Sequence, residues 1–242
     1  MTSPLDFDAL RGLVVLIDPG RMDASAAAFL ARRAADEGVA ALLIGDSFGT
    51  FDDATPVIRA MRGAAPSTPV IQFPAAAAQL SADVDAVLLL SLVSGRNAQY
   101  LIEEHVRAVP FFERHPTVEA ISTAYLLVDG GSVTSVESVS QTRPLPANKP
   151  ELVRAHVRAA SLIGMRATYL DAGSGANRPV SGASIRAARD AATGPLIVGG
   201  GVREAAAVRR ARDAGADLVV VGTLFERESA RTVRALAHAA RA

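Results

Sequence analysis

The chain has 242 residues, 25 Lys and Arg residues against 25 Asp and Glu residues, and no cysteine. This length suits a single domain, and a (β/α)8 barrel typically needs about 250 residues. The balanced charge leaves no basic excess to neutralise many phosphates, so we expect no nucleic-acid partner. The lack of cysteine excludes disulfides, thiolate metal sites and cysteine nucleophiles.

The N-terminal sequence argues against a signal peptide. Asp6 and Asp8 lie where such a peptide would need a basic and then an apolar region. The longest strongly apolar stretch, residues 86–93, is far shorter than the roughly 18 residues of a membrane span. We therefore expect a soluble chain without a transmembrane segment, with the cytoplasm as the default location.

Short apolar runs alternate with helical segments along the whole chain. The runs cover residues 13–17, 40–44, 70–73, 86–90, 120–128, 167–170, 196–198 and 218–221, and the helical segments cover 24–37, 52–62, 99–109, 150–163, 183–191, 204–213 and 226–241. Continuous apolar runs are typical of parallel strands buried on both faces. The alternation predicts an α/β fold, a parallel (β/α)8 TIM barrel formed by one domain over residues 1–242, with an open doubly wound sheet as the alternative.

Two connections break this regularity. The sequence FPAAAAQLSADVD, between the third and fourth runs, has room for one short helix at most, so the barrel is predicted to have a thin or missing helix after strand 3. Residues 129–148, after the fifth run, are polar and longer than a structural connection requires. Such a segment is either a lid or binding element, or simply a mobile insertion.

Acidic and hydroxyl side chains follow the first two predicted strands. Asp18 comes directly after the first strand, and Asp46 and Ser47 come after the second. Oxygen ligands of this kind suit Mg²⁺, and Arg21 adds a permanent positive charge that could bind a phosphate or a carboxylate. The residues alone support equally well a structural role in which Asp18 caps the following turn.

Glycine-rich turns follow the last three predicted strands. LIVGGGVRE and AGADLVVVGTL place Gly200, Gly201, Gly222 and Thr223 where phosphate commonly binds in such barrels. YLDAGSGA, after the sixth run, adds further backbone donors, and its Asp171 lies where catalytic residues of barrels are found. Tight turns and a helix-capping aspartate are the structural alternatives. Apolar strand ends with Phe73, Tyr125 and Tyr169 could line a groove for a long apolar ligand or simply form the core.

Taken together, these segments resemble the geranylgeranylglyceryl phosphate synthase family and its bacterial heptaprenylglyceryl phosphate synthase branch. The matching pieces run in order along nearly the whole chain: LIDPG, LIGDS, IQFP, SLVSGRN, RPLPANKPE, LIGMRATYLDAGSGA, LIVGGGVR and AGADLVVVGT. The resemblance implies a Mg²⁺-dependent prenyltransferase that joins an allylic polyprenyl diphosphate to a hydroxyl of sn-glycerol 1-phosphate.

The resemblance also implies roles for individual residues. Asp171 and Arg21 would be catalytic, and Asp18, Ser47 and Asp46 would bind the metal. The acceptor phosphate would be bound by Tyr169, Leu170, Asp171, Ala172, Gly173, Ser174, Gly175, Gly200, Gly201, Gly222 and Thr223. The family also forms dimers and larger assemblies, so we expect a homo-oligomer, and its lipid substrate implies transient membrane contact.

The departures from the family pattern lie on the metal and prenyl side. Gly20 and Arg21 replace an Asp and a Lys, and Asp171 stands where the family usually has Glu. A related branch, in the biosynthesis of moenomycin-type phosphoglycolipids, joins a farnesyl chain to 3-phosphoglycerate. That acceptor is the first alternative, because Arg21 or Arg178 could bind its carboxylate.

Two alternatives belong to other classes. One is a barrel that binds a phosphorylated metabolite or a prenyl chain without turning it over. The other is a different phosphate-binding barrel enzyme, such as an isomerase or an aldolase. The single lysine, Lys149, is predicted near a helix start rather than at a strand end, which argues against a Schiff-base aldolase.

Overall fold

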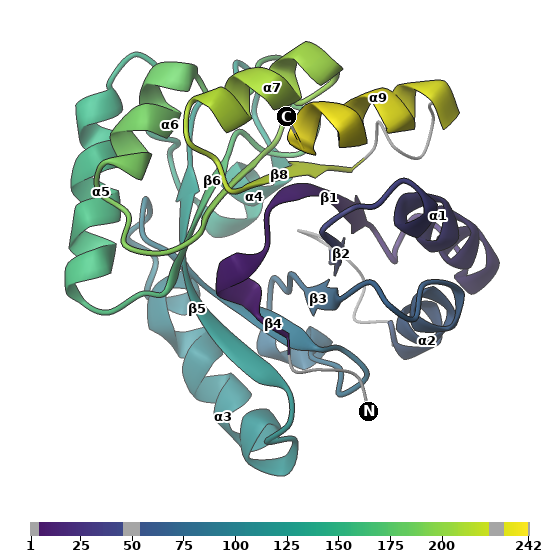
Figure 1. The fold of residues 1–242 in the computed structure, drawn as a ribbon. Helices are drawn as coiled ribbons and strands as arrows, with labels where there is room; N and C mark the ends of the chain where they lie inside the picture. The colour runs from purple at the N-terminus through teal and green to yellow at the C-terminus, as the bar shows by residue number, and fades with distance from the viewer. Residues whose placement is uncertain (1–4, 46–53, 223–229, 242) are drawn as a thin grey trace.

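Eight parallel strands form a closed barrel in the order in which they occur in the sequence. The computed structural model describes residues 5–45, 54–222 and 230–241. The strands are β1 (Gly12–Ile17), β2 (Ala41–Ile44), β3 (Val70–Gln72), β4 (Ala86–Leu92), β5 (Glu119–Leu127), β6 (Ala167–Asp171), β7 (Leu196–Gly199) and β8 (Leu218–Val221). β8 pairs with β1 and closes the ring. The predicted (β/α)8 barrel is therefore confirmed, and the open sheet is excluded (Figure 1).

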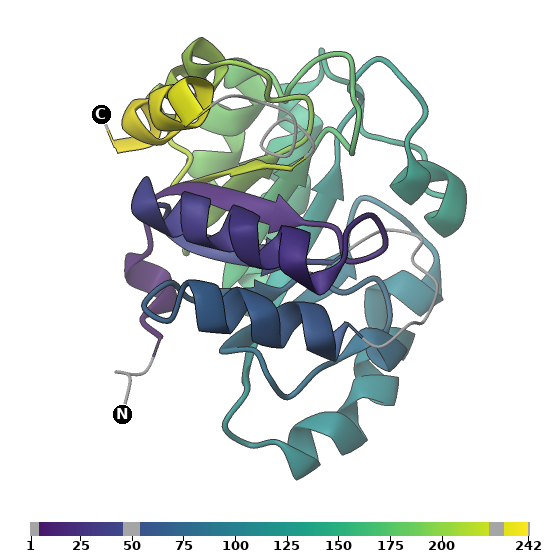
Figure 2. The ribbon, with the colours of Figure 1, turned by 90° about the vertical axis from the view of Figure 1, so that its right-hand side faces the viewer.

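Helices cover the outside of the barrel. They are α1 (Ala24–Asp36), α2 (Thr55–Ala64), α3 (Glu104–Arg114), α4 (Ser135–Ser140), α5 (Pro150–Leu162), α6 (Gly182–Arg189), α7 (Ala205–Asp213) and α9 (Ala230–Arg241). Figure 2 shows α1 and α2 lying side by side on one flank. None of the helices within the described ranges is long and apolar enough to cross a membrane.

The two irregular connections differ in outcome. Between β3 and β4, where every residue is described, the chain forms only the short 3-10 helix η2 (Ala77–Gln79), so the expected loss of a helix after strand 3 is confirmed. The polar segment 129–148 contains α4, which the sequence pattern did not predict. Thr134 caps α4 by accepting a hydrogen bond from the Glu137 amide at 3.3 Å, a local signal for a helix start.

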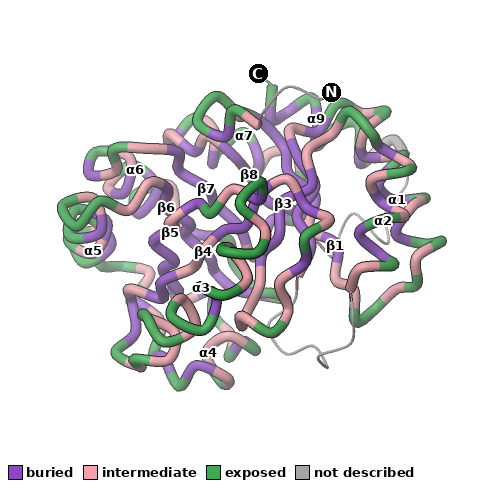
Figure 3. Tube along the Cα trace, turned by 90° about the horizontal axis from the view of Figure 1, so that it is seen from below, coloured by how far each residue is buried: buried purple, intermediate pink, exposed green. Residues whose placement is uncertain are grey.

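The strands are apolar along their whole length because both faces are buried. Phe7, Tyr169 and Ile197 belong to the cluster inside the barrel, whereas Leu170 and Val198 belong to the cluster between strands and helices. Alternate residues of one strand thus enter different layers, as strand geometry requires. Figure 3 shows buried residues along the central strands and exposed residues on the outer turns.

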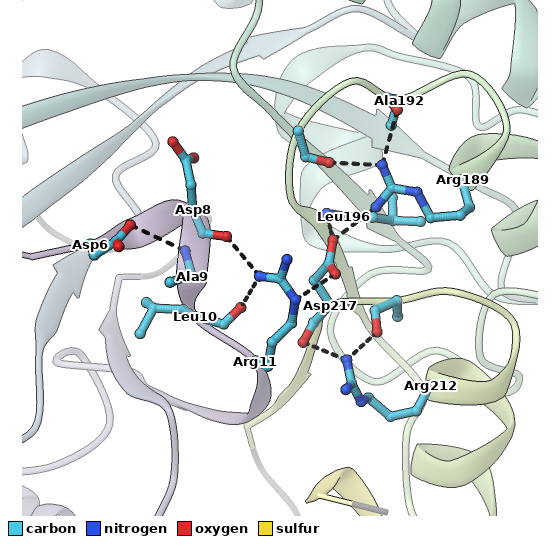
Figure 4. Close-up of polar contacts among 12 residues, drawn as sticks. Asp6, Asp8, Ala9, Leu10, Arg11, Arg189, Ala192, Leu196, Arg212 and Asp217 are labelled. Atoms are coloured by element: carbon cyan, nitrogen blue, oxygen red, sulfur yellow. Dashed lines mark hydrogen bonds and ion pairs between the residues drawn. The ribbon is translucent and has the colours of Figure 1, made fainter.

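A carboxylate at the amino-terminal end of the barrel joins several elements. Asp217, just before β8, accepts hydrogen bonds from the Arg189 guanidinium and the Leu196 amide, both at 2.8 Å (Figure 4). It also forms an ion pair with Arg11 at 2.9 Å. Its side chain is only 15% exposed, so removing it leaves partly buried donors without an acceptor.

We expect the substitution Asp217→Ala to lower the free energy of unfolding by about 2–4 kcal/mol. For a chain of this size the thermal midpoint would fall by roughly 5–15 °C. Asp83→Ala is the matched control, because Asp83 is 34% exposed and forms an ion pair at 3.1 Å with Arg59, which is 69% exposed. That control should cost less than about 1 kcal/mol. Equal losses in both variants, measured by thermal melts, would contradict this role of Asp217.

Candidate active site

The predicted site residues that the structure describes lie at the carboxyl ends of their strands or just after them, and so meet at one mouth of the barrel. Asp171 is the last residue of β6, Gly200 and Gly201 follow β7, and Gly222 follows β8. Asp18 follows β1 on the same edge. In a parallel barrel all strands end on the same side, so the fold brings together residues separated by up to about two hundred positions.

Asp171 is the buried acidic centre of this mouth, with 6% of its surface exposed. One carboxylate oxygen accepts a hydrogen bond from the Tyr125 hydroxyl at 2.5 Å, and the other accepts one from the Gly173 amide at 2.7 Å. Burial raises the pKa of Asp171 above its usual value, and these two hydrogen bonds oppose part of that rise. A carboxylate with a raised pKa is a better proton acceptor than an ordinary aspartate.

Three aromatic rings pack beside Asp171. Phe73 stacks on Tyr169 with ring centroids 5.0 Å apart, and Tyr125 meets both rings nearly edge-on, at 5.8 Å and 5.5 Å. Burial, reinforced by the nearby Asp171 charge, raises the pKa of both tyrosines well above the usual value. Both tyrosines therefore stay protonated, and Tyr125 acts as a hydrogen-bond donor to Asp171.

The glycine turns after β6 and β7 lie against each other. Gly200 has a φ angle of +80°, and a Cβ added there would lie 2.5 Å from the Gly173 amide nitrogen and 2.6 Å from Asp171 Oδ1. Only a residue without a side chain allows this approach. Arg203 extends from the second turn toward the first and donates to the Ala176 carbonyl at 3.0 Å. The two turns thus lie in contact with each other next to the carboxylate.

The other residues predicted to bind phosphate differ in what they present. The Leu170 side chain lies in the core between strands and helices, so only its backbone faces this region. The amide of Ala172 bonds the Gly199 carbonyl, whereas Ser174 and Gly175 are exposed. Thr223 lies outside the described residues.

On the acidic side of the mouth, Asp18 is held by its own turn. It accepts a hydrogen bond from the Gly20 amide at 2.9 Å and forms an ion pair with Arg21 at 3.0 Å. Arg21 therefore lies beside Asp18, with its side chain 56% exposed. Asp46 and Ser47 lie outside the described residues. Within residues 5–45, 54–222 and 230–241, no three His, Asp or Glu side chains gather as a metal cluster.

An apolar pocket opens beside the aromatic rings and encloses about 750 Å³, part of it open to solvent. Its walls come from the segment after β3, from β4, from α3 and from α4. The lining includes Phe73 and Tyr125, followed by Leu88, Leu90, Leu92, Ala108, Val136 and Val139. The pocket lies on the side where the connection between β3 and β4 has no α-helix, and it shares Phe73 and Tyr125 with the surroundings of Asp171.

The segment 129–148 supplies part of this wall through α4. The Asn97 side chain donates a hydrogen bond to the Ser140 carbonyl at 3.2 Å and so ties α4 to the end of β4. Arg178, between β6 and α6, is 66% exposed and forms an ion pair with Asp129 of this segment at 3.9 Å. The polar segment is therefore a structural part of the pocket.

Sequence reasoning missed two contacts at this site. It placed Tyr125 near a strand end but did not connect its hydroxyl to Asp171, and it assigned no role to Arg203. Tyr125 pairs directly with Tyr169 in the β5–β6 register, two residues before Asp171. Adjacent predicted strands bearing a tyrosine and an aspartate near their ends were the available signal.

Comparisons with known proteins identify the family of this chain. The PcrB family model matches residues 8–240. A geranylgeranylglyceryl phosphate synthase of Spirosoma linguale is 42% identical over 90% of this chain and 87% of its own length. The same enzyme of Methanothrix thermoacetophila is 41% identical over 88% of this chain and 83% of its own length.

A solved structure is also similar. The (S)-3-O-geranylgeranylglyceryl phosphate synthase of Thermoplasma acidophilum, in complex with its substrate sn-glycerol-1-phosphate, superimposes with a TM-score of 0.88 at 27% identity. The alignment covers 96% of this chain and 94% of that one. The names of these relatives confirm the predicted enzyme class, a prenyltransferase. The family match, over nearly the whole length, shows that this chain belongs to the PcrB family.

Proposed function

We propose that this protein transfers a prenyl group from an allylic polyprenyl diphosphate to a hydroxyl of sn-glycerol 1-phosphate, forming a prenyl ether. The arrangement that carries the proposal is the position of Asp171 between the glycine turns and the apolar pocket. The glycine turns suit the acceptor phosphate, and the pocket suits the prenyl chain. The similarity to synthases that make this ether supports the choice of acceptor.

The reaction needs a base for the acceptor hydroxyl, and Asp171 is that base. The acceptor oxygen forms a bond to the allylic carbon, the bond from that carbon to the diphosphate oxygen breaks, and Asp171 takes the hydroxyl proton. Tyr125 stays protonated and holds the carboxylate at its Oδ2 atom. The Gly173 amide holds Oδ1, so both oxygens are positioned before the acceptor binds.

The aromatic rings suit the charge that develops on the prenyl donor. Positive charge grows at the allylic carbon as the diphosphate leaves, and aromatic faces attract cations. Phe73 and Tyr125 line the pocket, Tyr125 contacts Asp171 and Phe73 packs on Tyr125, so the reacting carbon would meet these rings. The same walls exclude water that would otherwise quench the cation.

We further propose that Mg²⁺ assists at the acidic side of the mouth. The Asp18 carboxylate fits the ion because it is a hard oxygen ligand that is 24% exposed at a strand end. Asp46 and Ser47 remain the predicted additional ligands, and diphosphate and water oxygens would complete the coordination. When bound, the ion neutralises charge on the departing diphosphate. Arg21 lies next to Asp18 and adds a second cation for the same group.

The proposal is tested by incubating the purified protein with Mg²⁺, farnesyl or geranylgeranyl diphosphate, and either sn-glycerol 1-phosphate or 3-phosphoglycerate. We expect a prenyl ether with sn-glycerol 1-phosphate. Formation of an ether only with 3-phosphoglycerate would support the alternative acceptor. The absence of an ether with every combination would refute the enzymatic proposal. Thermal stabilisation by the acceptor in an inactive protein would instead indicate a binding barrel.

Removal of the metal should abolish the reaction. We expect chelation with EDTA to reduce ether formation at least about a hundredfold, because the diphosphate charge is then left without its neutralising ion. Added Mg²⁺ should restore activity, and the Asp18→Asn variant should need a higher concentration to do so. The thermal shift that Mg²⁺ produces with inorganic diphosphate gives a second readout. Full activity in EDTA would contradict the assignment of Mg²⁺.

A further inference from the structure

One wall of the apolar pocket is formed by the short segment Pro74–Leu80, which takes the place of a helix between β3 and β4. Three consecutive amides of this segment donate to side-chain oxygens. Gln79 Oε1 accepts from Ala75 at 2.7 Å and from Ala76 at 3.3 Å. The Ala77 amide donates to Glu104 Oε2 at 2.8 Å, across the gap to α3. The position of the wall thus depends on a few side-chain contacts.

Glu104 joins this wall to the neighbouring wall formed by α3. It is the first residue of α3, its side chain is 12% exposed, and it lines the pocket. Its second oxygen, Oε1, accepts from Arg107 at 2.6 Å and from Gln99 at 3.3 Å. Both carboxylate oxygens of Glu104 therefore accept hydrogen bonds, and the carboxylate links the Pro74–Leu80 segment to α3. A carboxylate in a mostly apolar lining needs such partners.

We propose that Glu104 is a specificity-determining residue that sets the length of prenyl chain the pocket accepts. The hydrogen bond to Ala77 holds the Pro74–Leu80 wall against α3, and this contact limits the space of the pocket that both line. This inference rests on the proposed prenyltransferase function. Removing the carboxylate frees the wall and enlarges the pocket, so longer donors gain relative to shorter ones.

Two independent substitutions break this contact from opposite sides. Glu104→Ala removes the acceptor. Ala77→Pro removes the donor and leaves Glu104 in place, and proline suits this first position of η2 because Ala76 before it has an extended backbone, with φ −150° and ψ 156°. Glu104→Gln keeps an oxygen for the Ala77 amide. Glu103→Ala is the matched control, since Glu103 is 53% exposed and lies 3.9 Å from the same Arg107.

The experiment measures kcat/KM for farnesyl, geranylgeranyl and longer prenyl diphosphates in each variant. For Glu104→Ala and Ala77→Pro we expect the ratio of longer to shorter donors to rise at least about fivefold, mainly through KM of the donor. KM for the acceptor should stay within about twofold. Glu104→Gln and Glu103→Ala should keep the wild-type ratio. Hydrogen exchange of the segment 73–85 should accelerate in Glu104→Ala and not in Glu103→Ala.

The outcomes separate this inference from the proposed function. A wild-type protein that is inactive with every donor refutes the proposed function. An active wild type whose donor ratio is unchanged in both Glu104→Ala and Ala77→Pro refutes the role of Glu104. An unchanged exchange rate in Glu104→Ala also refutes it, because the wall is then not held by this contact. If one of the two variants fails to fold, the other gives the ratio.

Discussion

The Asp171→Asn variant should lose nearly all prenyl transfer while keeping its fold. Asparagine has the same shape but cannot accept the proton of the acceptor hydroxyl, so we expect kcat to fall about 10²–10⁴-fold. KM for the acceptor should change little, because the glycine turns remain in place. Steady-state kinetics with the acceptor varied measures both quantities. An Asp171→Asn enzyme with more than about a tenth of wild-type kcat would contradict the role as base.

The Asp171→Asn substitution should lower activity but not the stability of the fold at a pH where the wild-type carboxyl group is ionised. Burial raises the folded-state pKa of Asp171 above its ordinary value of 3.8. The contribution of this carboxyl group to the free energy of unfolding is therefore fully present below pH 3.8 and is lost as the pH rises through the raised pKa. As the pH rises and Asp171 ionises, the wild type gains a buried charge that the neutral asparagine side chain lacks. The stability of the variant relative to the wild type should therefore increase as the pH rises above 3.8 and decrease as the pH returns toward 3.8. Thermal melts across this range measure the difference.

The Tyr125→Phe variant tests whether Tyr125 acts on the reaction through Asp171. It removes the hydroxyl that donates to Asp171 at 2.5 Å but keeps the ring that packs on Phe73 and Tyr169. That hydrogen bond lowers the pKa of Asp171, so its loss raises the pKa further. The acid limb of the pH–rate profile should therefore move to higher pH in Tyr125→Phe. A shift to lower pH would show that Tyr125 does not act through Asp171.

The barrel could be predicted from the sequence because its signal is repeated and local. Each strand is a short apolar run such as Leu218–Val221, and burial on both faces produces the same pattern at every repeat. The missing helix after β3 was equally visible, since too few residues separate the two strands. α4 was missed because its sequence, SVESVS, has few strong helix formers, and its packing on the pocket decides its structure.

For the candidate site, the positions of the residues could be predicted from the sequence but their side-chain contacts could not. The predicted strand ends indicated that Asp171, Gly200 and Asp18 lie at the same end of the barrel, because parallel strands end together. The contacts could not be predicted in this way: whether Arg21 binds a substrate or pairs with Asp18 depends on side-chain rotamers of the turn. The hydrogen bond from Ala77 to Glu104 joins the connection after β3 to the start of α3, and no sequence pattern links these two segments. Contacts of this kind depend on tertiary packing.

The Gly200→Ala variant should strongly impair acceptor binding, although it adds only one methyl group. The added Cβ would lie 2.5 Å from the Gly173 nitrogen, 2.6 Å from Asp171 Oδ1 and 2.7 Å from the Ala172 nitrogen. Two of these atoms belong to backbone that cannot rotate away, so the two glycine turns must separate. We expect kcat/KM for the acceptor to fall at least about a hundredfold, since a shift of about 1 Å at a reacting group has effects of that size.

Gly164→Ala separates this clash from backbone strain. Gly164 has a φ angle of +86°, close to the +80° of Gly200, but a Cβ there would meet nothing within 4 Å. Both variants should lose about 1–2 kcal/mol of unfolding free energy from the left-handed backbone. Only Gly200→Ala should also lose acceptor binding, measured as the thermal shift produced by sn-glycerol 1-phosphate. If both variants keep wild-type kinetics and the same shift, the turn after β7 does not form the phosphate site, and the acceptor must bind elsewhere at the mouth.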